Sequence, residues 1–109
     1  MIEIKAQIPT VNIEIAAGNR RVFEIVITAD GQPYELAGQH LKMHIQTAFG
    51  DVIDGGDYLA AVGNTLTLTL PPELTADAVW RTARYDILNA TASQTLMRGE
   101  IRKIDTVTT

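Results

Sequence analysis

The sequence predicts an all-β fold, because short alternating segments and turn residues fill the chain without any amphipathic helix of useful length. About seven to nine predicted strands are separated by turns roughly every 8–12 residues, which is typical of a sandwich or a barrel. The clearest strand is Thr65–Leu70, where threonine and leucine alternate. Side chains alternate between the two faces of a strand, so Leu66, Leu68 and Leu70 are predicted core residues.

Two N-terminal segments, residues 2–8 and 11–15, alternate isoleucine or valine with polar residues on either side of Pro9. They are predicted to form either one kinked strand or two strands that pair with different sheets. The other strands predicted before Thr65 are bounded by glycine-containing turns. These strands lie at residues 21–29, 39–48, 51–54 and 58–62.

A short helical crossover is predicted after the Thr65–Leu70 strand. Pro71 and Pro72 end that strand, because proline cannot donate to a ladder, and Pro72 suits the first turn of a helix. One or two helical turns at residues 72–79 would carry the chain across an end of the fold. Trp80, together with Leu74, is predicted to seal that end.

The C-terminal part predicts two strands joined by a polar turn at residues 91–94. In the first of these strands, Tyr85 and Ile87 share the inner face. The second strand, residues 96–104, is predicted to point Met97, Gly99 and Ile101 inward and to point Arg98, Glu100 and Arg102 outward. Because sheet edges are often guarded by charged side chains, this strand is also predicted to be an open edge.

Composition favours a single domain over residues 1–109, with 46% hydrophobic and 20% charged residues. Thirteen acidic and nine basic residues give a net charge of −4, which argues against binding of nucleic-acid phosphates. The chain has no cysteine, so it can form neither a disulfide nor a cysteine-based zinc site. No signal peptide is recognised, and no apolar run approaches the ~20 residues that span a bilayer, so synthesis in the cytoplasm without membrane binding is expected.

Several short motifs stand out between residues 29 and 108. They are ADGQPYELAG at 29–38, GNTLTLTLP at 63–71 with TA at 75–76, YDI at 85–87, MRGEI at 97–101 and VT at 107–108. These motifs resemble those of small tailed-phage and prophage virion proteins, including the immunoglobulin-like N-terminal domains of phage baseplate upper proteins. The resemblance covers roughly residues 20 to 109. Asn89 and Lys103 depart from the pattern, since apolar residues usually stand at those positions.

The resemblance implies an Ig-like β-sandwich and a non-enzymatic structural or assembly component of a phage or prophage tail, baseplate or neck. The expected location is the virion, after synthesis in the cytoplasm of a bacterial host. The expected partners are other virion subunits and possibly a second copy of the chain. The alternative is a binding module for a host-surface glycan or protein, which an exposed aromatic beside acids, such as Tyr34 or Tyr58, would favour.

An enzyme is the third functional class, and no constellation of residues supports it. His40 and His44 would lie ~13 Å apart on one strand, too far for a shared metal ion. The aspartates at 51, 54 and 57 flank two glycines but match no calcium loop. Ser93 has no base near it in the sequence. The sequence therefore predicts no catalytic, metal or cofactor-binding residue.

The positive charge late in the chain predicts an interface. Arginine is enriched in protein interfaces, and a docking patch for a neighbouring subunit is predicted at Arg84, Arg98, Arg102 and Lys103. The alternative is a solvated face on which these residues pair with acids on adjacent strands. Tyr85 is predicted to be either the corner tyrosine of an Ig-like sandwich, with its hydroxyl bonded to nearby backbone, or a plain core aromatic.

Overall fold

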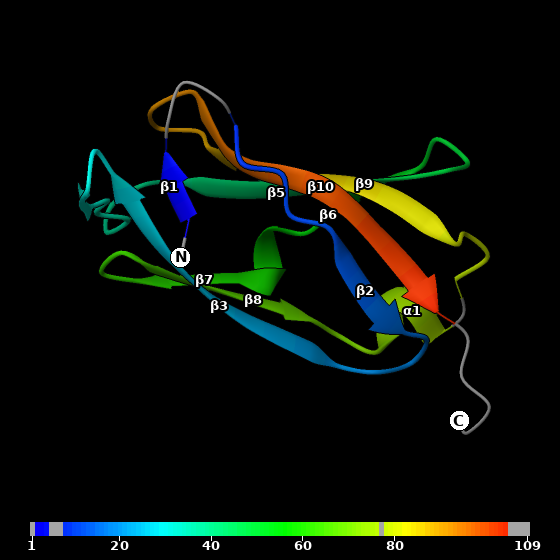
Figure 1. Cartoon of the computed structure of the whole chain (residues 1–109). Helices are drawn as coiled ribbons and strands as arrows, with labels where there is room; N and C mark the ends of the chain where they lie inside the picture. The colour runs from blue at the N-terminus through cyan, green and yellow to red at the C-terminus, as the bar shows by residue number, and fades with distance from the viewer. Residues whose placement is uncertain (1, 5–7, 77, 105–109) are drawn as a thin grey trace.

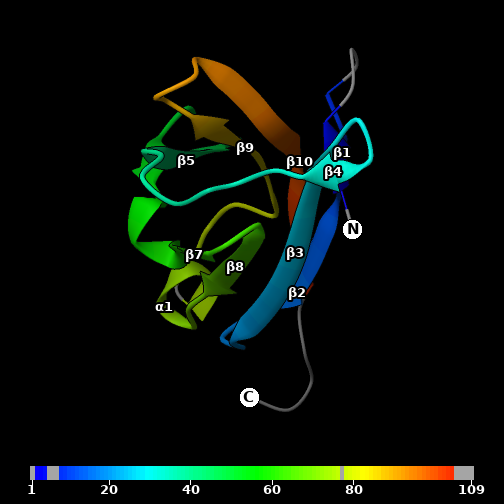
Figure 2. The same ribbon diagram turned by 90° about the vertical axis from the view of Figure 1, so that its left-hand side faces the viewer.

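The computed structural model describes residues 2–4, 8–76 and 78–104, in which two five-stranded sheets pack face to face (Figures 1 and 2). The first sheet has the order β1-β3-β8-β7, with β4 also paired to β3, and the second has the order β2-β10-β9-β5-β6. The strands are β1 (Ile2–Ile4), β2 (Ile13–Ala16), β3 (Arg21–Ala29), β4 (Gln32–Pro33), β5 (Leu41–Thr47), β6 (Val52–Asp54), β7 (Leu59–Val62), β8 (Thr65–Leu70), β9 (Thr82–Asn89) and β10 (Gln94–Ile104).

The predicted all-β sandwich is confirmed. In the nomenclature of immunoglobulin domains, β3, β8 and β7 take the places of strands B, E and D. In the other sheet, β10, β9 and β5 take the places of strands G, F and C. The two N-terminal strands lie at sheet margins and pair in parallel, β1 with β3 and β2 with β10. The N-terminal segments therefore form two strands in different sheets, which is one of the two alternatives predicted from the sequence.

The core lies between the sheets and follows the predicted alternation. In β8 the three leucines are fully buried, and in β5 Met43, Ile45 and Thr47 are buried while the residues between them are exposed. The buried apolar cluster also includes Ile27, Ile87 and Ile101, as well as Leu74 and Trp80 at the end of the sandwich. The residues that alternate with these buried ones along each strand therefore form the two outer faces.

The helical crossover is shorter than predicted. The sequence indicated residues 72–79, whereas α1 spans only Glu73–Ala76. Thr75 is fully buried, and its hydroxyl accepts a hydrogen bond from the amide of Gly18 at 3.0 Å. The amide of Ala78 then bonds back to the carbonyl of Thr75 at 3.2 Å, a three-residue step that tightens the end of the helix. This tertiary anchor takes the place of a second turn. A separate 3-10 turn, η1, spans Gly56–Tyr58.

The prediction that the last strand is an open edge is wrong. β10 lies between β9 and β2, because residues 101–104 pair in parallel with Ile13–Ala16. A further bridge joins Thr10 to Arg98. Alternation indicates which face of a strand is buried, but it carries no information about the strands on either side of it.

The hairpin of β9 and β10 contains a bulge. Its register shifts between Thr95 and Met97, and both Leu96 and Met97 are buried although they are adjacent in sequence. An extra residue in one strand lets neighbouring side chains point to the same side. Leu96 therefore joins Met97 and Ile101 in the core, whereas the sequence analysis placed only alternate residues of this strand there.

Candidate functional site

A polar face covers the outside of the second sheet. Its polar side chains come from β10, β9, β5 and β6, whose register aligns them in rows across the sheet. One row consists of Arg98, Asp86, His44 and Asp54, and the adjacent row consists of Glu100, Arg84, Gln46 and Val52. All eight side chains are exposed. Positive and negative groups therefore alternate among Arg98, Asp86, Arg84 and Glu100, both along each row and between the two rows.

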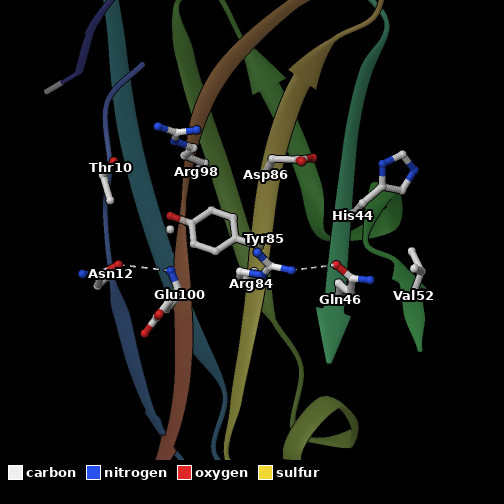
Figure 3. Close-up of a pocket in the computed structure, with 11 residues that line it drawn as sticks. Thr10, Asn12, His44, Gln46, Val52, Arg84, Tyr85, Asp86, Arg98 and Glu100 are labelled. Carbon is white, nitrogen blue, oxygen red and sulfur yellow. Dashed lines mark hydrogen bonds between the residues drawn. The ribbon is translucent and has the colours of Figure 1, made fainter. Parts of the chain in front are cut away.

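Seven of these eight residues, all except Asp54, form the floor of an open groove of about 870 Å³, called here the polar groove (Figure 3). Thr10 and Asn12, which precede β2, form one wall, and Val52 of β6 lies at the other side. The groove runs across strands, so its side chains are held at fixed spacings by the ladder hydrogen bonds beneath them. Such a surface suits an extended contact with a complementary surface.

The arginines of the polar groove keep their charges unpaired. Arg84 Nη2 donates to Gln46 Oε1 at 3.2 Å. Within the described residues, neither Arg84 nor Arg98 forms an ion pair, although Glu100 and Asp86 lie opposite them on the neighbouring strand. An ion pair does form beside the groove, between Arg102 and Glu14 at 3.7 Å. Exposed pairs of that kind contribute little to stability.

The structure brings together three of the four predicted interface residues. Arg84 and Arg98 line the polar groove, and Arg102 lies on the same face further along β10. Lys103 has the opposite parity, and its ammonium group donates to the carbonyl oxygen of Ala78 at 2.6 Å. Lys103 therefore ties β10 to the segment after α1 and does not belong to the polar face.

Tyr85 joins the floor of the polar groove to the segment before β2. Its side chain is buried, and its hydroxyl points towards the segment that carries Thr10 and Asn12 (Figure 3). The hydroxyl donates to the carbonyl oxygen of Val11 in that segment at 2.6 Å. Gly99 is the residue opposite Tyr85 on β10, and a Cβ at Gly99 would overlap that same carbonyl. The absence of a side chain at Gly99 thus lets the Val11 carbonyl turn inward to meet the tyrosine.

The inward turn of Val11 changes the ladder between β10 and the chain before β2. The amide of Arg98 donates to the carbonyl of Pro9 at 3.1 Å, so the next regular bond would join the amide of Glu100 to the carbonyl of Val11. Instead, the Glu100 amide donates to Asn12 Oδ1 at 3.1 Å. The Asn12 side chain replaces the missing acceptor, so no donor is left unpaired at this point.

Tyr85 has features of both predicted roles, the core aromatic and the corner tyrosine. The ring is part of the core cluster, and the hydroxyl bonds to backbone as a corner tyrosine does. The acceptor, however, lies 74 residues earlier in the chain and not a few residues upstream. Burial raises the pKa of Tyr85 to about 12.

Replacing Tyr85 with phenylalanine should cost about 1–3 kcal/mol at neutral pH, because the Val11 carbonyl loses its donor. Since the folded-state pKa of about 12 exceeds the ordinary value of 10.0, folding favours the neutral phenol. The contribution of the Tyr85 hydroxyl to the free energy of unfolding is fully present below pH 10 and is lost as the pH rises towards 12. Denaturant unfolding across this range should therefore show wild type losing its advantage over Tyr85→Phe. A difference independent of pH would contradict the role given to the hydroxyl.

Asn89 is a buried polar residue that the sequence analysis did not explain. Its Nδ2 donates to the hydroxyl of Tyr34 at 2.9 Å and to Gln39 Oε1 at 3.3 Å, and its Oδ1 accepts from the amide of Ala92 at 3.2 Å. The Tyr34 hydroxyl in turn donates to Gln94 Oε1 at 3.2 Å. Asn89 thereby fastens the β9–β10 turn to the chain entering β5.

Neither tyrosine that would have favoured glycan binding is an exposed aromatic. Tyr34 is half-buried and engaged by Asn89 and Gln94. Tyr58 is also half-buried, and its pKa is raised by burial first and then by the charges of Glu73 and Asp57. Both rings pack against the core cluster.

The part of the chain that the structure describes has neither a metal-binding cluster nor a membrane-spanning helix. No cluster of three or more histidine, cysteine or acidic side chains is placed to hold a metal ion there. Asp54 accepts a hydrogen bond from the amide of Gly56 at 2.9 Å, which is a turn-forming contact. None of the helices described there is long and apolar enough to cross a membrane.

The chain is similar in fold to solved structures, one of which is named below. No protein-family model matches the chain, and a search of curated proteins finds no match. Among solved structures, the chain is similar to the N-terminal domain of phage TP901-1 ORF48, with 12% sequence identity and a TM-score of 0.49. The match covers 94% of this chain and 92% of that one. No residue role is transferred from that domain to this chain.

Proposed function

We propose that this chain is a non-enzymatic structural component of a phage or prophage tail, baseplate or neck, and that it docks onto a neighbouring virion subunit through the polar face. The observation that carries the docking proposal is the polar groove, in which Arg84 and Arg98 form no ion pair with any residue that the structure describes. The assignment to a virion is supported by the motifs at residues 29–38 and 63–71, which resemble those of phage virion proteins.

The alternating charges of the polar face favour binding to one specific partner over nonspecific electrostatic attraction. A partner must present carboxylates to Arg84 and Arg98 and basic groups to Asp86 and Glu100, in the same order. Charge complementarity of this kind fixes the register of an interface and rejects wrong partners, because like charges placed opposite one another cost several kcal/mol. The partner expected is therefore a protein surface of mixed charge, not a nucleic acid or a membrane.

The arrangement of groups in the polar groove supports a binding role over a catalytic one. Within the described residues, no hydroxyl in the groove is hydrogen-bonded to His44 or to a carboxylate, as an activated nucleophile would be. The hydrogen bonds of the exposed polar groups there involve Gln46 and Asn12, whose side-chain amides do not titrate in the physiological range and so cannot serve as general acids or bases. We also propose that residues 1–109 form one sandwich domain.

The test is incorporation into particles. In a host that carries the phage or prophage with its own copy deleted, a tagged wild-type chain should sediment with tails or virions on a density gradient. An Arg84→Glu, Arg98→Glu double variant should be incorporated at least about tenfold less, because two charge reversals oppose docking. Lys42→Glu is the matched control, since Lys42 is exposed on the same sheet but does not line the groove.

The two parts of the proposal fail in different ways. A wild-type chain that never sediments with particles would contradict the virion assignment. A double variant that is incorporated as well as Lys42→Glu would leave that assignment intact and would contradict docking through the polar groove. Equal melting temperatures for the three proteins establish that folding does not explain the difference.

A further inference from the structure

The first sheet has an open edge along most of β3. From Arg21 to Val26, β3 pairs with β8 on one side. On its other side β1 pairs only with Ile27, Thr28 and Ala29. Within the described residues, no strand pairs with the other side of β3 between residues 21 and 26.

The direction of the backbone groups along this edge follows from one hydrogen bond. The amide of Ile27 donates to the carbonyl of Asn64, which precedes β8, at 2.9 Å. Backbone groups of alternate residues point to the same side of a strand, so Phe23 and Ile25 also bond towards β8. Val22, Glu24 and Val26 therefore direct their N–H and C=O groups away from the sheet, on the side where β1 pairs further along.

An apolar cleft of about 420 Å³ lies beside this edge, between β3 and the start of β2 in the opposite sheet. β2 and β3 run along the same side of the molecule (Figure 2). One charged residue, Glu24, lines the cleft among apolar ones. The lining residues are Val11, Ile13, Val22, Phe23, Glu24, Ile25, Leu68 and Met97.

We propose that the open edge of β3 accepts an extended segment of a partner polypeptide as an added strand. An unpaired edge is a template for strand addition, in which backbone bonds give affinity and alternate side chains give specificity. β1 already pairs with this edge of β3, so the added strand would continue the line of β1. This inference concerns a different surface from the polar groove and does not rest on the proposed function.

The chemistry of the cleft defines the segment that fits. Apolar side chains at alternate positions would fill the space between Phe23, Ile13 and Met97. A lysine or arginine is expected opposite Glu24, because opposite charges on adjacent strands stabilise the pair. A second copy of the chain fits less well, since antiparallel pairing of two β3 strands about Glu24 would place two carboxylates opposite each other.

The probe is a labelled synthetic peptide that alternates valine and threonine around one central lysine. Saturating peptide should protect the amides of Val22, Glu24 and Val26 from hydrogen exchange, measured residue by residue by NMR. The amides of Phe23 and Ile25 already bond to β8 and should change little. A second peptide with glutamate at the centre should bind about tenfold more weakly.

Two substitutions at Glu24 sharpen the test. Glu24→Lys should reverse the preference between the two peptides, and Glu24→Pro should abolish binding. Proline at this position removes an N–H that points out of the sheet, so the fold should survive, as proline does on edge strands. Phe23→Pro is the control, because it removes a bond to β8 and should unfold the protein.

Three results would overturn the proposal. One is saturation without protection of Val22, Glu24 and Val26. Another is protection confined to a different edge, such as β6 or β7. The third is self-association of the wild-type chain through the β3 edge that the peptide does not displace. The exchange measurement needs only the wild-type protein, so it decides the matter even where a variant fails to fold.

Discussion

Replacing Gly99 with alanine is expected to destabilise the fold by about 3 kcal/mol or more. The added Cβ would occupy the position of the Val11 carbonyl oxygen, and backbone cannot move aside as a flexible side chain can. Displacing Val11 would break its hydrogen bond from Tyr85 and the bond between Asn12 and the Glu100 amide. The measurement is the free energy of unfolding in denaturant.

The matched control for this substitution is Gly56→Ala. There the added Cβ would meet only a carboxylate oxygen of Asp54, at 3.2 Å. That oxygen ends an exposed side chain and can shift slightly while it keeps its hydrogen bond from the Gly56 amide, so a change within about 1 kcal/mol is expected. A double variant of Gly99→Ala with Tyr85→Phe should cost less than the sum of the two, because both remove the same contact. Equal costs for the two glycines, or strict additivity, would contradict the link between Tyr85 and Val11.

Leu68→Ala is expected to cost about 2–5 kcal/mol, because the side chain is completely buried between the sheets and its loss leaves a cavity. Its neighbours in the same sheet are Phe23 of β3 and Leu59 of β7, both held by ladder bonds that limit collapse around the cavity. Thr67→Ala, one residue away on the outer face, should cost less than about 1 kcal/mol. Similar unfolding free energies for the two variants would mean that the faces of β8 have been assigned the wrong way round.

Local pattern was sufficient to predict the faces of the strands. The limits of β3 and β8 agree with the sequence analysis, because alternation and the flanking turn residues are properties of neighbouring positions. The sandwich class followed from the same signals repeated along the chain. The neighbours of each strand did not follow, since the pairing of β2 with β10 joins segments at opposite ends of the sequence.

The length of the crossover also depended on a distant contact. Propensity favoured one or two turns over residues 72–79, but the buried hydroxyl of Thr75 accepts a hydrogen bond from the amide of Gly18 and α1 ends at Ala76. Asn89 was conspicuous in the sequence as a polar residue among apolar ones. Its partners, Tyr34 and Gln39, are far from it in the chain, so its role could not be predicted.

The candidate site was partly predictable. Parity alone placed Arg84, Arg98 and Arg102 on one outer face, and the register then aligned the first two with Asp86 and Glu100. Lys103 was grouped with them by its position in sequence, although its parity differs and its ammonium binds Ala78. The groove itself could not be predicted, because one wall comes from Thr10 and Asn12 at the other end of the chain.

Docking through the polar face can be tested most directly by hydroxyl-radical footprinting of the chain inside purified particles, compared with the free protein. We expect His44, Arg84 and Arg98 to lose reactivity in the particle, because a partner covers them. Val62 is exposed on the other sheet, away from both the polar groove and the open edge of β3, and serves as the internal reference. Unchanged reactivity of the three polar-face residues, with protection of Val62 instead, would show that the opposite face makes the contact.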